Sequence, residues 1–98
     1  MSEKKLKRLE WSPRASEDYF EAWRYIVEHH SLRNADLVVS RIMKAALSLA
    51  HFPLLGKSGQ IPGTRELVVP RAPFVIVYRV MAGSLRIERV LPDAMDRA

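Results

Sequence analysis

The 98-residue chain contains no cysteine. This absence excludes disulfide bonds, thiolate nucleophiles and cysteine-ligated metal sites, and it suits a reducing compartment. No apolar run reaches the length of a membrane span, and the charged start MSEKKLKRLEW is not followed by the apolar stretch of a signal peptide. We therefore expect a cytoplasmic protein with no membrane partner.

Several common catalytic patterns are absent as well. The histidines show no metal-ligand spacing, because His29 and His30 are adjacent and point in different directions on a helix, while His51 lies a helix away. Ser, His and Asp occur without the spacing of a hydrolase triad. Segment 56–63, GKSGQIPG, departs from the phosphate-loop pattern and follows a helix instead of a strand. We expect no metal, no cofactor, and a plain loop over this segment.

What the chain does contain is enough apolar sequence for a single folded domain over residues 1–98. Hydrophobic residues make up 48% of the chain and charged residues 28%, which is typical of a globular protein. The net charge of +5 is compatible with an acidic partner such as nucleic acid, the ribosome or an acidic protein. A diffuse positive surface explains the same charge equally well.

The first helix is predicted to begin at a clear capping signal. Ser12 is a good N-cap, and Pro13 suits the first helical position. Apolar residues then recur at spacings of four, three and four until about His29 or His30, which predicts one buried face. Trp23 widens this face and is more typical of a core residue, whereas Phe20 falls off it and is expected to be exposed.

A second helix should follow after a short link. Ser31 is its first capping candidate and Asn34 the later one, and Pro53 ends the helix. Because the link allows little else, the two helices should form an antiparallel hairpin. Their apolar faces cannot be buried by each other alone, so they require a sheet to pack on.

The helical spacing gives way to short runs of β-branched residues after segment 56–63. These runs predict three strands at Thr64–Val69, Phe74–Met81 and Leu85–Leu91, joined by PRAP and by a tight AGS turn. An extended segment that carries Leu9 and Trp11 precedes the helices. The predicted fold is α+β, with an N-terminal strand and a two-helix antiparallel hairpin packed on one face of a small, mainly antiparallel sheet.

Each predicted strand carries one arginine in an otherwise apolar row. Strand alternation places Arg65 with Leu67 and Val69, Arg79 with Val75 and Val77, and Arg89 with Leu85 and Ile87. A charge beside a buried strand is costly unless it is paired or its head reaches water. At the rim of a sheet such guanidinium groups can bind phosphate or carboxylate bidentately. The structural alternative is pairing with Glu66, Glu88 or a helix carboxylate.

Several motifs in order carry a family resemblance: WSPRASEDYFEAWRYI in the first helix, then GTRELVV, VYRV and RVL, then the tail. Together they resemble the RelE/ParE superfamily of bacterial toxins from about Leu9 to Asp96. The resemblance implies the toxin of a type II toxin–antitoxin pair. It also implies a ParD-like antitoxin that binds through an amphipathic helix and an extended segment. Because three arginines interrupt apolar rows, we hypothesise that carboxylates of this antitoxin neutralise them.

The superfamily contains two mechanisms on one fold. RelE-like members cut mRNA on the ribosome, and ParE-like members inhibit DNA gyrase. Many relatives have a histidine after the VL of the last strand, where this chain has Pro92, and a proline cannot transfer a proton. The ending DAMD is more similar to the ParE type. The resemblance therefore favours a gyrase inhibitor that is not an enzyme.

The alternatives are a ribosome-dependent mRNA endoribonuclease and an inactive toxin fold that only binds its antitoxin. In the nuclease case, Arg65, Arg79 and Arg89 would stabilise the transition state. In the gyrase case no catalytic residue is expected. The candidates for contact with the target or the antitoxin are Lys57, Arg65, Arg79, Arg89, Phe20 and Trp23.

Overall fold

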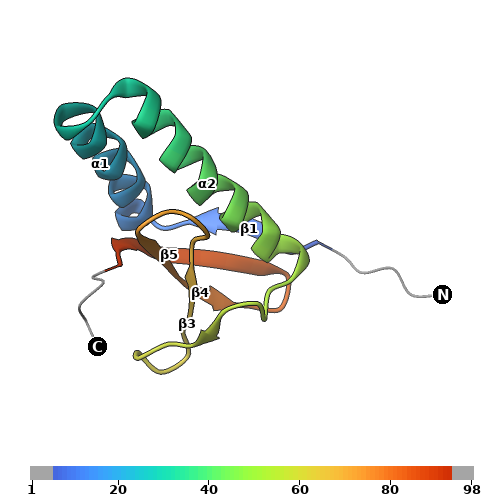
Figure 1. The fold of residues 1–98 in the computed structure, drawn as a ribbon. Helices are drawn as coiled ribbons and strands as arrows, with labels where there is room; N and C mark the ends of the chain where they lie inside the picture. Colours follow the sequence, from blue (N-terminus) through green and yellow to red (C-terminus); the bar gives the residue numbers. More distant parts are fainter. Residues whose placement is uncertain (1–5, 94–98) are drawn as a thin grey trace.

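Two helices pack against one face of a five-stranded sheet (Figure 1). The structure, a computed structural model, describes residues 6–93. In chain order the elements are β1 (Arg8–Trp11), α1 (Pro13–His29), α2 (Leu32–His51), β2 (Lys57–Ser58), β3 (Arg65–Val68), β4 (Phe74–Val80) and β5 (Ser84–Pro92). The predicted α+β architecture is confirmed, with the helical hairpin on one side of the sheet. Neither described helix is long and apolar enough to span a bilayer.

Both helices begin at serine caps. The Ser12 hydroxyl accepts a hydrogen bond from the Ala15 amide at 2.9 Å, and Pro13 occupies the first turn of α1. The Ser31 hydroxyl accepts from the Asn34 amide at 3.0 Å, so Ser31 rather than Asn34 is the cap of α2. These side chains satisfy amide groups that have no partner within the helix. The helix starts follow directly from local sequence.

The core lies between the hairpin and the sheet. On the helices, small residues such as Ala15, Ala35 and Ala46 are fully buried, which lets the helix backbones approach the elements packed against them closely. Larger side chains fill the remaining space; the fully buried ones include Ile42, Leu49, Ile76, Tyr78, Leu85 and Ile87. Removal of this apolar surface from water is the main stabilising term of the fold.

The strand order is β1-β5-β4-β3-β2. β1 pairs parallel with β5, and the other neighbours are antiparallel. The prediction of a plain loop over 56–63 is wrong in part, because Lys57 pairs with Glu66 and Ser58 with Arg65 to make the short strand β2. Two residues are too few to show an alternating pattern, so no strand was predictable there.

A bulge in β5 changes which residues face the helices. Tyr78 pairs with Ile87 and Val77 pairs with Arg89, which leaves Glu88 without a partner on β4. Before the bulge Ile87 faces the core, and after it Val90 does. The prediction that Arg89 shares a side with Leu85 and Ile87 is therefore wrong. Strict alternation would have put the guanidinium of Arg89 into the core, and the extra residue turns it to the opposite, open face.

Candidate functional site

The three predicted arginines do not form one site. Arg65 pairs with Tyr78, a fully buried core residue, so it lies on the helix side of the sheet as its alternation with Leu67 predicts. Arg79 pairs with Arg86, and Arg89 pairs with Val77. By strand register these last two arginines project from the open face of the sheet, and the head of Arg89 reaches Asp18 of α1 at the edge of that face.

Arg65 holds the segment that follows α2. Its Nε and Nη2 atoms donate to the Gly56 carbonyl at 3.0 and 2.7 Å, and Nη2 also donates to the Leu54 carbonyl at 3.3 Å. The Tyr78 hydroxyl donates to the Pro53 carbonyl at 2.8 Å and accepts from the Gly56 amide at 2.9 Å. A Cβ at Gly56 would lie 2.8 Å from this hydroxyl, so the close approach requires glycine. Arg65 thus pairs with backbone carbonyls and not with Glu66.

The open face carries a basic pocket of about 470 Å³, here called the arginine pocket. Its lining consists of Ser12, Pro13, Arg14, Ile61, Thr64, Val77, Arg79, Arg86, Glu88 and Arg89. Four guanidinium groups line the pocket with one carboxylate, and Asp18 outside the lining pairs with Arg89, so these described residues leave an excess of two positive charges. Such a concentration of one sign of charge attracts anions.

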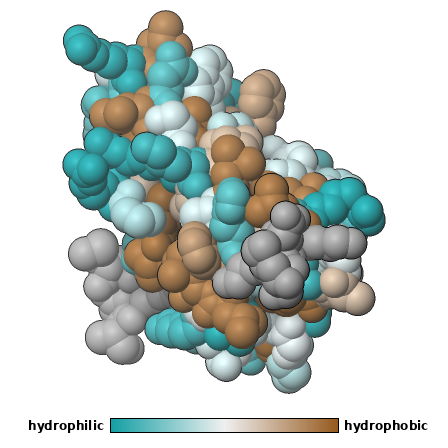
Figure 2. Space-filling model, turned by 90° about the vertical axis from the view of Figure 1, so that its right-hand side faces the viewer, coloured by the Kyte–Doolittle hydropathy of each residue, from teal (hydrophilic) through white to brown (hydrophobic). Residues whose placement is uncertain are grey.

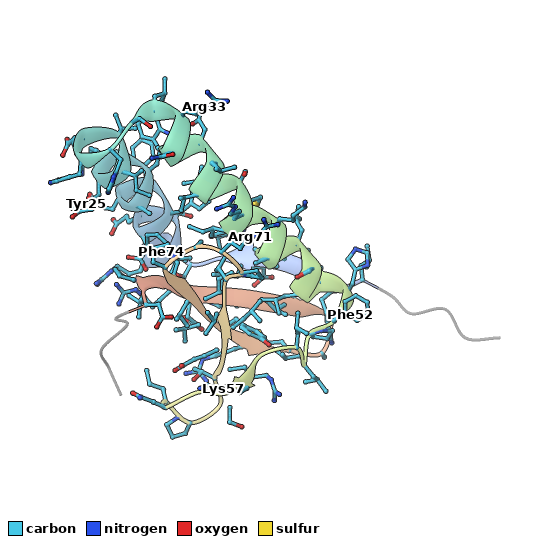
Figure 3. All side chains as sticks on the ribbon, in the orientation of Figure 1. Tyr25, Arg33, Phe52, Lys57, Arg71 and Phe74 are labelled. Atoms are coloured by element: carbon cyan, nitrogen blue, oxygen red, sulfur yellow. The ribbon has the colours of Figure 1, made fainter. Side chains whose placement is uncertain are left out.

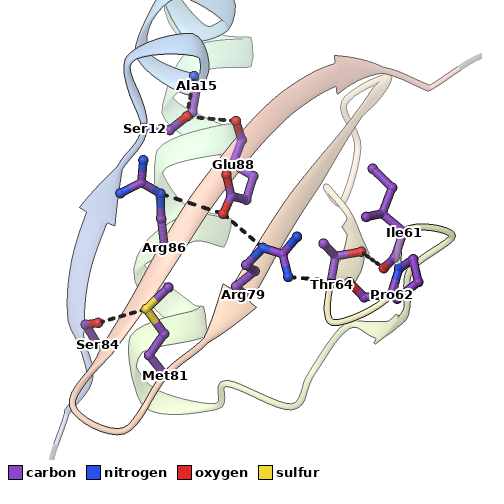
Figure 4. A network of polar contacts seen from close by, with 10 residues as sticks. All are labelled: Ser12, Ala15, Ile61, Pro62, Thr64, Arg79, Met81, Ser84, Arg86 and Glu88. Carbon is purple, nitrogen blue, oxygen red and sulfur yellow. Dashed lines mark hydrogen bonds and ion pairs between the residues drawn. The ribbon is translucent and has the colours of Figure 1, made fainter.

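Glu88 stands between two of the arginines (Figure 4). Its Oε2 atom lies 3.2 Å from Nε of Arg79 and 3.6 Å from Nε of Arg86. Arg79 and Arg86 are direct cross-strand partners, and like charges in that position repel each other. The carboxylate of Glu88 offsets this repulsion, and the bulge is what brings it to the open face together with Arg89.

The turn between β2 and β3 supports Arg79. Nη1 of Arg79 donates to the Pro62 carbonyl at 3.4 Å, and the Thr64 hydroxyl donates to the Ile61 carbonyl at 2.6 Å (Figure 4). Gly63 has a φ of 84°, and a Cβ there would lie 2.6 Å from Nη1. Only glycine both adopts this conformation and leaves the guanidinium in place.

Arg89 is held by the helix carboxylate of Asp18. Nε and Nη2 of Arg89 donate to the two carboxylate oxygens at 2.7 and 3.1 Å, and the Val90 amide donates to Oδ2 at 3.0 Å. Burial alone would raise the pKa of Asp18, but the bonds from Arg89 and Val90 outweigh it and keep that pKa below its ordinary 3.8. The hydrogen bond with Asp18 raises the pKa of Arg89. The sequence left two outcomes open for Arg89: binding of an external phosphate or carboxylate at the rim of the sheet, or pairing with a carboxylate of the protein. The structure shows Arg89 paired with a helix carboxylate.

Pro92 lies apart from the arginine pocket. It pairs with Phe74 and lines a separate cavity of about 610 Å³ between α1 and the end of β5, together with Tyr25, Ile26 and Arg89. A side chain at position 92 therefore projects from the side of the sheet that faces the helices. The tail residues Ala94 to Asp96, on which the similarity to the ParE type partly rested, lie outside the described residues.

The remaining candidates lie at separate places. Lys57 is exposed on β2, at the opposite end of the molecule from the hairpin tip marked by Arg33 (Figure 3). Phe20 is 65% exposed, as predicted, and stacks on Trp23 with a centroid distance of 6.4 Å. The Trp23 indole donates to Asp36 at 3.0 Å and so joins α1 to α2. Phe20 is the exposed member of the pair.

A second basic groove of about 590 Å³ runs between α2 and β3. Its apolar lining includes Leu37, Leu55 and Leu67, and its cations are Arg41, Lys44 and Arg71. The apolar surface continues onto the segment after α2, where Phe52, Leu54 and Leu55 are each more than half exposed. Figure 2 views the side on which α2 ends, where apolar patches lie between hydrophilic ones. We call the groove between α2 and β3, together with the apolar surface that continues from it, the α2–β3 groove.

The prediction from sequence missed Arg14, Arg86 and Glu88 as pocket residues. Arg86 and Glu88 alternate with Leu85 and Ile87, so the pattern did indicate that they face away from the core. Arg14 joins them only because β1 lies beside β5 and delivers the start of α1 to the rim of the pocket. That is a tertiary contact without a local signal. In residues 6–93 no group of three or more His, Asp or Glu is placed to hold a metal ion.

Comparison with protein families identifies the chain. The model for the ParE toxin of the type II toxin–antitoxin system, parDE, matches residues 9–97. The chain belongs to the ParE toxin family. A relative from Sinorhizobium fredii, named "Putative toxin Y4kP", is 40% identical over 74 residues, which are 76% of this chain and 76% of that protein.

Solved structures show the same fold. A chain of the chromosomal ParDE toxin–antitoxin system from P. aeruginosa matches with a TM-score of 0.83 and 23% identity, over 91% of this chain and 98% of that chain. A chain of the E. coli DinJ–YafQ toxin–antitoxin complex matches with a TM-score of 0.57 and 18% identity, over 95% and 99%. At these identities the likeness concerns the fold, and it is greater for the ParDE chain than for the DinJ–YafQ chain.

Proposed function

We propose that this ParE-family toxin inhibits DNA gyrase and is neutralised by a ParD-like antitoxin. The observation that carries the proposal is the family match over residues 9–97. Gyrase inhibition is the activity that the resemblance to ParE-like toxins implies. It requires a binding surface and not an acid–base pair, which agrees with a pocket rich in arginine, because arginine stays protonated and is a poor proton-transfer group.

A nuclease is the second candidate, and Glu88 is the observation that favours it. This carboxylate faces Arg79 and Arg86 and is the one general-base candidate among the residues that line the pocket. A nuclease also needs a group that protonates the leaving oxygen, and the pocket lining holds no histidine or tyrosine. Pro92, at the position where many relatives have histidine, starts from the helix side. These features favour the gyrase proposal.

The α2–β3 groove is the surface that best suits the antitoxin. An apolar floor with Arg41, Lys44 and Arg71 along it fits an amphipathic helix with acidic flanks. β2 pairs only with Arg65 and Glu66, so over the described residues the rest of that edge of β3 has no strand beside it. An extended antitoxin segment there would add backbone hydrogen bonds to the sheet.

The test is a DNA supercoiling assay with purified gyrase and the full-length toxin, with and without the antitoxin encoded beside it. Translation-coupled mRNA cleavage is measured in parallel. Loss of supercoiling that the antitoxin reverses is the expected result. Intact supercoiling with codon-phased mRNA cuts would establish the nuclease instead. No loss of supercoiling and no mRNA cleavage would indicate a fold that only binds its antitoxin.

The variant Pro92→His sharpens this choice. If gyrase is the target, histidine at this position should leave the supercoiling result unchanged and create no mRNA cleavage. If the fold retains a weakened nuclease site, the added acid–base group should raise cleavage by about a hundredfold or more, within the range by which general acid–base groups accelerate reactions. Gain of cleavage would count against the gyrase proposal.

A further inference from the structure

We propose that the arginine pocket binds the phosphodiester backbone of duplex DNA, and that Glu88 competes with the phosphate for Arg79 and Arg86. The inference deepens the proposed function, because DNA is the substrate of gyrase. It concerns direct binding by the toxin, however, and is tested without the enzyme.

The first support is the arrangement of charge. Asp18 engages both Nε and Nη2 of Arg89, whereas Arg79 and Arg86 share the single Oε2 atom of Glu88. Their side chains remain 38% and 39% exposed. A guanidinium group binds best when two of its N–H groups meet two oxygens of one anion. Arg79 and Arg86 therefore keep donor capacity that a phosphate can use.

The second support is the strand register. Arg79 and Arg86 are directly opposite each other on β4 and β5, an arrangement that is unfavourable without an anion between them. The bulge supplies one carboxylate at that point, and the turn at Pro62 and Gly63 fixes the position of Arg79. A nonbridging phosphate oxygen placed where Oε2 of Glu88 lies would contact both guanidinium groups. Glu88 would then rotate away and expose its charge to water.

The third support comes from α1. The helix starts at the pocket, since Ser12, Pro13 and Arg14 line its rim, and the first turn contains no acidic residue. The positive end of the helix dipole therefore adds to the attraction for an anion. This end alone would be a weak feature; here it points at the same pocket as four arginines.

The lining also indicates which nucleic acid fits. Proteins that bind single strands stack unpaired bases on aromatic side chains, and the pocket lining contains no aromatic residue. Contacts restricted to phosphates position a duplex without reading its sequence. A duplex backbone is thus favoured over single-stranded RNA or DNA, and the binding should be independent of sequence.

The experiment is fluorescence anisotropy of a labelled DNA duplex of about 20 base pairs, titrated with the antitoxin-free full-length toxin at several salt concentrations. If two or three phosphates are engaged, log K should fall with log salt with a slope of about −2 to −3. Arg79→Ala and Arg86→Ala should each weaken binding about fivefold and reduce the slope by about 1. Compared with Arg86→Ala, Arg86→Lys should restore the salt slope but only part of the affinity, because lysine keeps the charge and lacks the two-pronged guanidinium geometry.

Glu88→Gln is the decisive variant. It removes the competing charge and keeps the length of the side chain, so binding should tighten by about threefold or more. The matched control for Arg79→Ala is Arg33→Ala. It makes the same change of net charge, but at the tip of the hairpin (Figure 3). Unchanged circular dichroism and melting temperature would show that each variant is folded.

Several results would overturn the inference. They are equal weakening by Arg33→Ala and Arg79→Ala, no tightening by Glu88→Gln, preference for single-stranded RNA, or displacement by polyglutamate as effective as displacement by unlabelled duplex. The last result would assign the pocket to an acidic protein. Inhibition of gyrase without DNA binding would defeat this inference alone, and DNA binding without inhibition of gyrase would defeat the proposed function alone.

Discussion

The two faces of the sheet use the same strands for different purposes. On the helix side, Ile76, Tyr78 and Ile87 are fully buried, and the one charge in that row, on Arg65, is taken up by backbone carbonyls. On the open face, Arg79 and Arg86 remain partly exposed around one shared carboxylate. The buried side chains on the helix side stabilise the fold. The open face keeps charges whose mutual repulsion is only partly relieved, as is expected of a binding surface.

The boundary between the two faces depends on one residue. Without the bulge at Glu88, strand alternation in β5 would turn Arg89 toward the helices and Val90 toward solvent. With it, Val90 completes the core and Arg89 reaches Asp18 at the edge of α1. The bulge therefore contributes to both faces at once, by packing on one and by charge on the other.

Insertion of one alanine directly after Glu88 should have the largest effect. The bulge already accommodates one extra residue, so a second one shifts every later position of β5 to the other face, and the protein should lose at least about 4 kcal/mol and fail to unfold cooperatively. Chemical denaturation followed by tryptophan fluorescence measures this. The control is Glu88→Ala, which keeps the bulge and removes partly exposed ion pairs, and it should cost less than about 1 kcal/mol. Similar costs for both variants would mean that the register of β5 is fixed elsewhere.

A matched pair of valines compares the two faces directly. Val90 is 2% exposed in the core on the helix side, and Val75 is 3% exposed on the open face. Val90→Ala should cost about 2 to 3 kcal/mol, because it opens a cavity between helix and sheet. Val75→Ala should cost about 1 to 2 kcal/mol, because Val75, although buried, lies outside the core cluster between helices and sheet. Equal free energies of unfolding would show that the open face is packed as firmly as the core.

The sequence was sufficient to predict those features of the fold that depend on local signals. Ser12 and Ser31 predicted both helix starts, and the period of the apolar residues predicted the buried faces and the exposure of Phe20. The strand β2 was not predictable, since its pairing of Lys57 with Glu66 is set by the turn between them and not by any pattern within two residues.

The site was predictable only in part for a related reason. Arg79 was placed in the correct row, with Val75 and Val77, because β4 is regular, whereas Arg89 was misplaced because a bulge leaves no mark in the order of residues. Glu88 was recognised only as a pairing partner, although its alternation with Ile87 indicated the open face. Arg14 reaches the pocket through the pairing of β1 with β5, a contact between distant parts of the chain.

The smallest effect should come from the ion pair that joins the two faces. Asp18→Asn keeps an acceptor for the Val90 amide and removes the charge opposite Arg89, so at pH 7 it should cost about 1 kcal/mol, with solvent screening holding the value down. The folded pKa of Asp18 is lowered, so its contribution is present above the unfolded value of about 3.9 and is lost as pH falls through the folded pKa.

The free-energy difference between wild type and Asp18→Asn should therefore be constant from about pH 7 to pH 5 and shrink below about pH 4. Urea denaturation at stepped pH measures it. The control is Glu21→Gln, which removes an exposed pair with Arg24 on the same helix and should cost only a few tenths of a kcal/mol. A difference between wild type and Asp18→Asn that stays constant below pH 4 would show that the Asp18 side chain stabilises the protein through shape and hydrogen bonding, and that the charge of Arg89 is not what fixes α1 to the edge of β5.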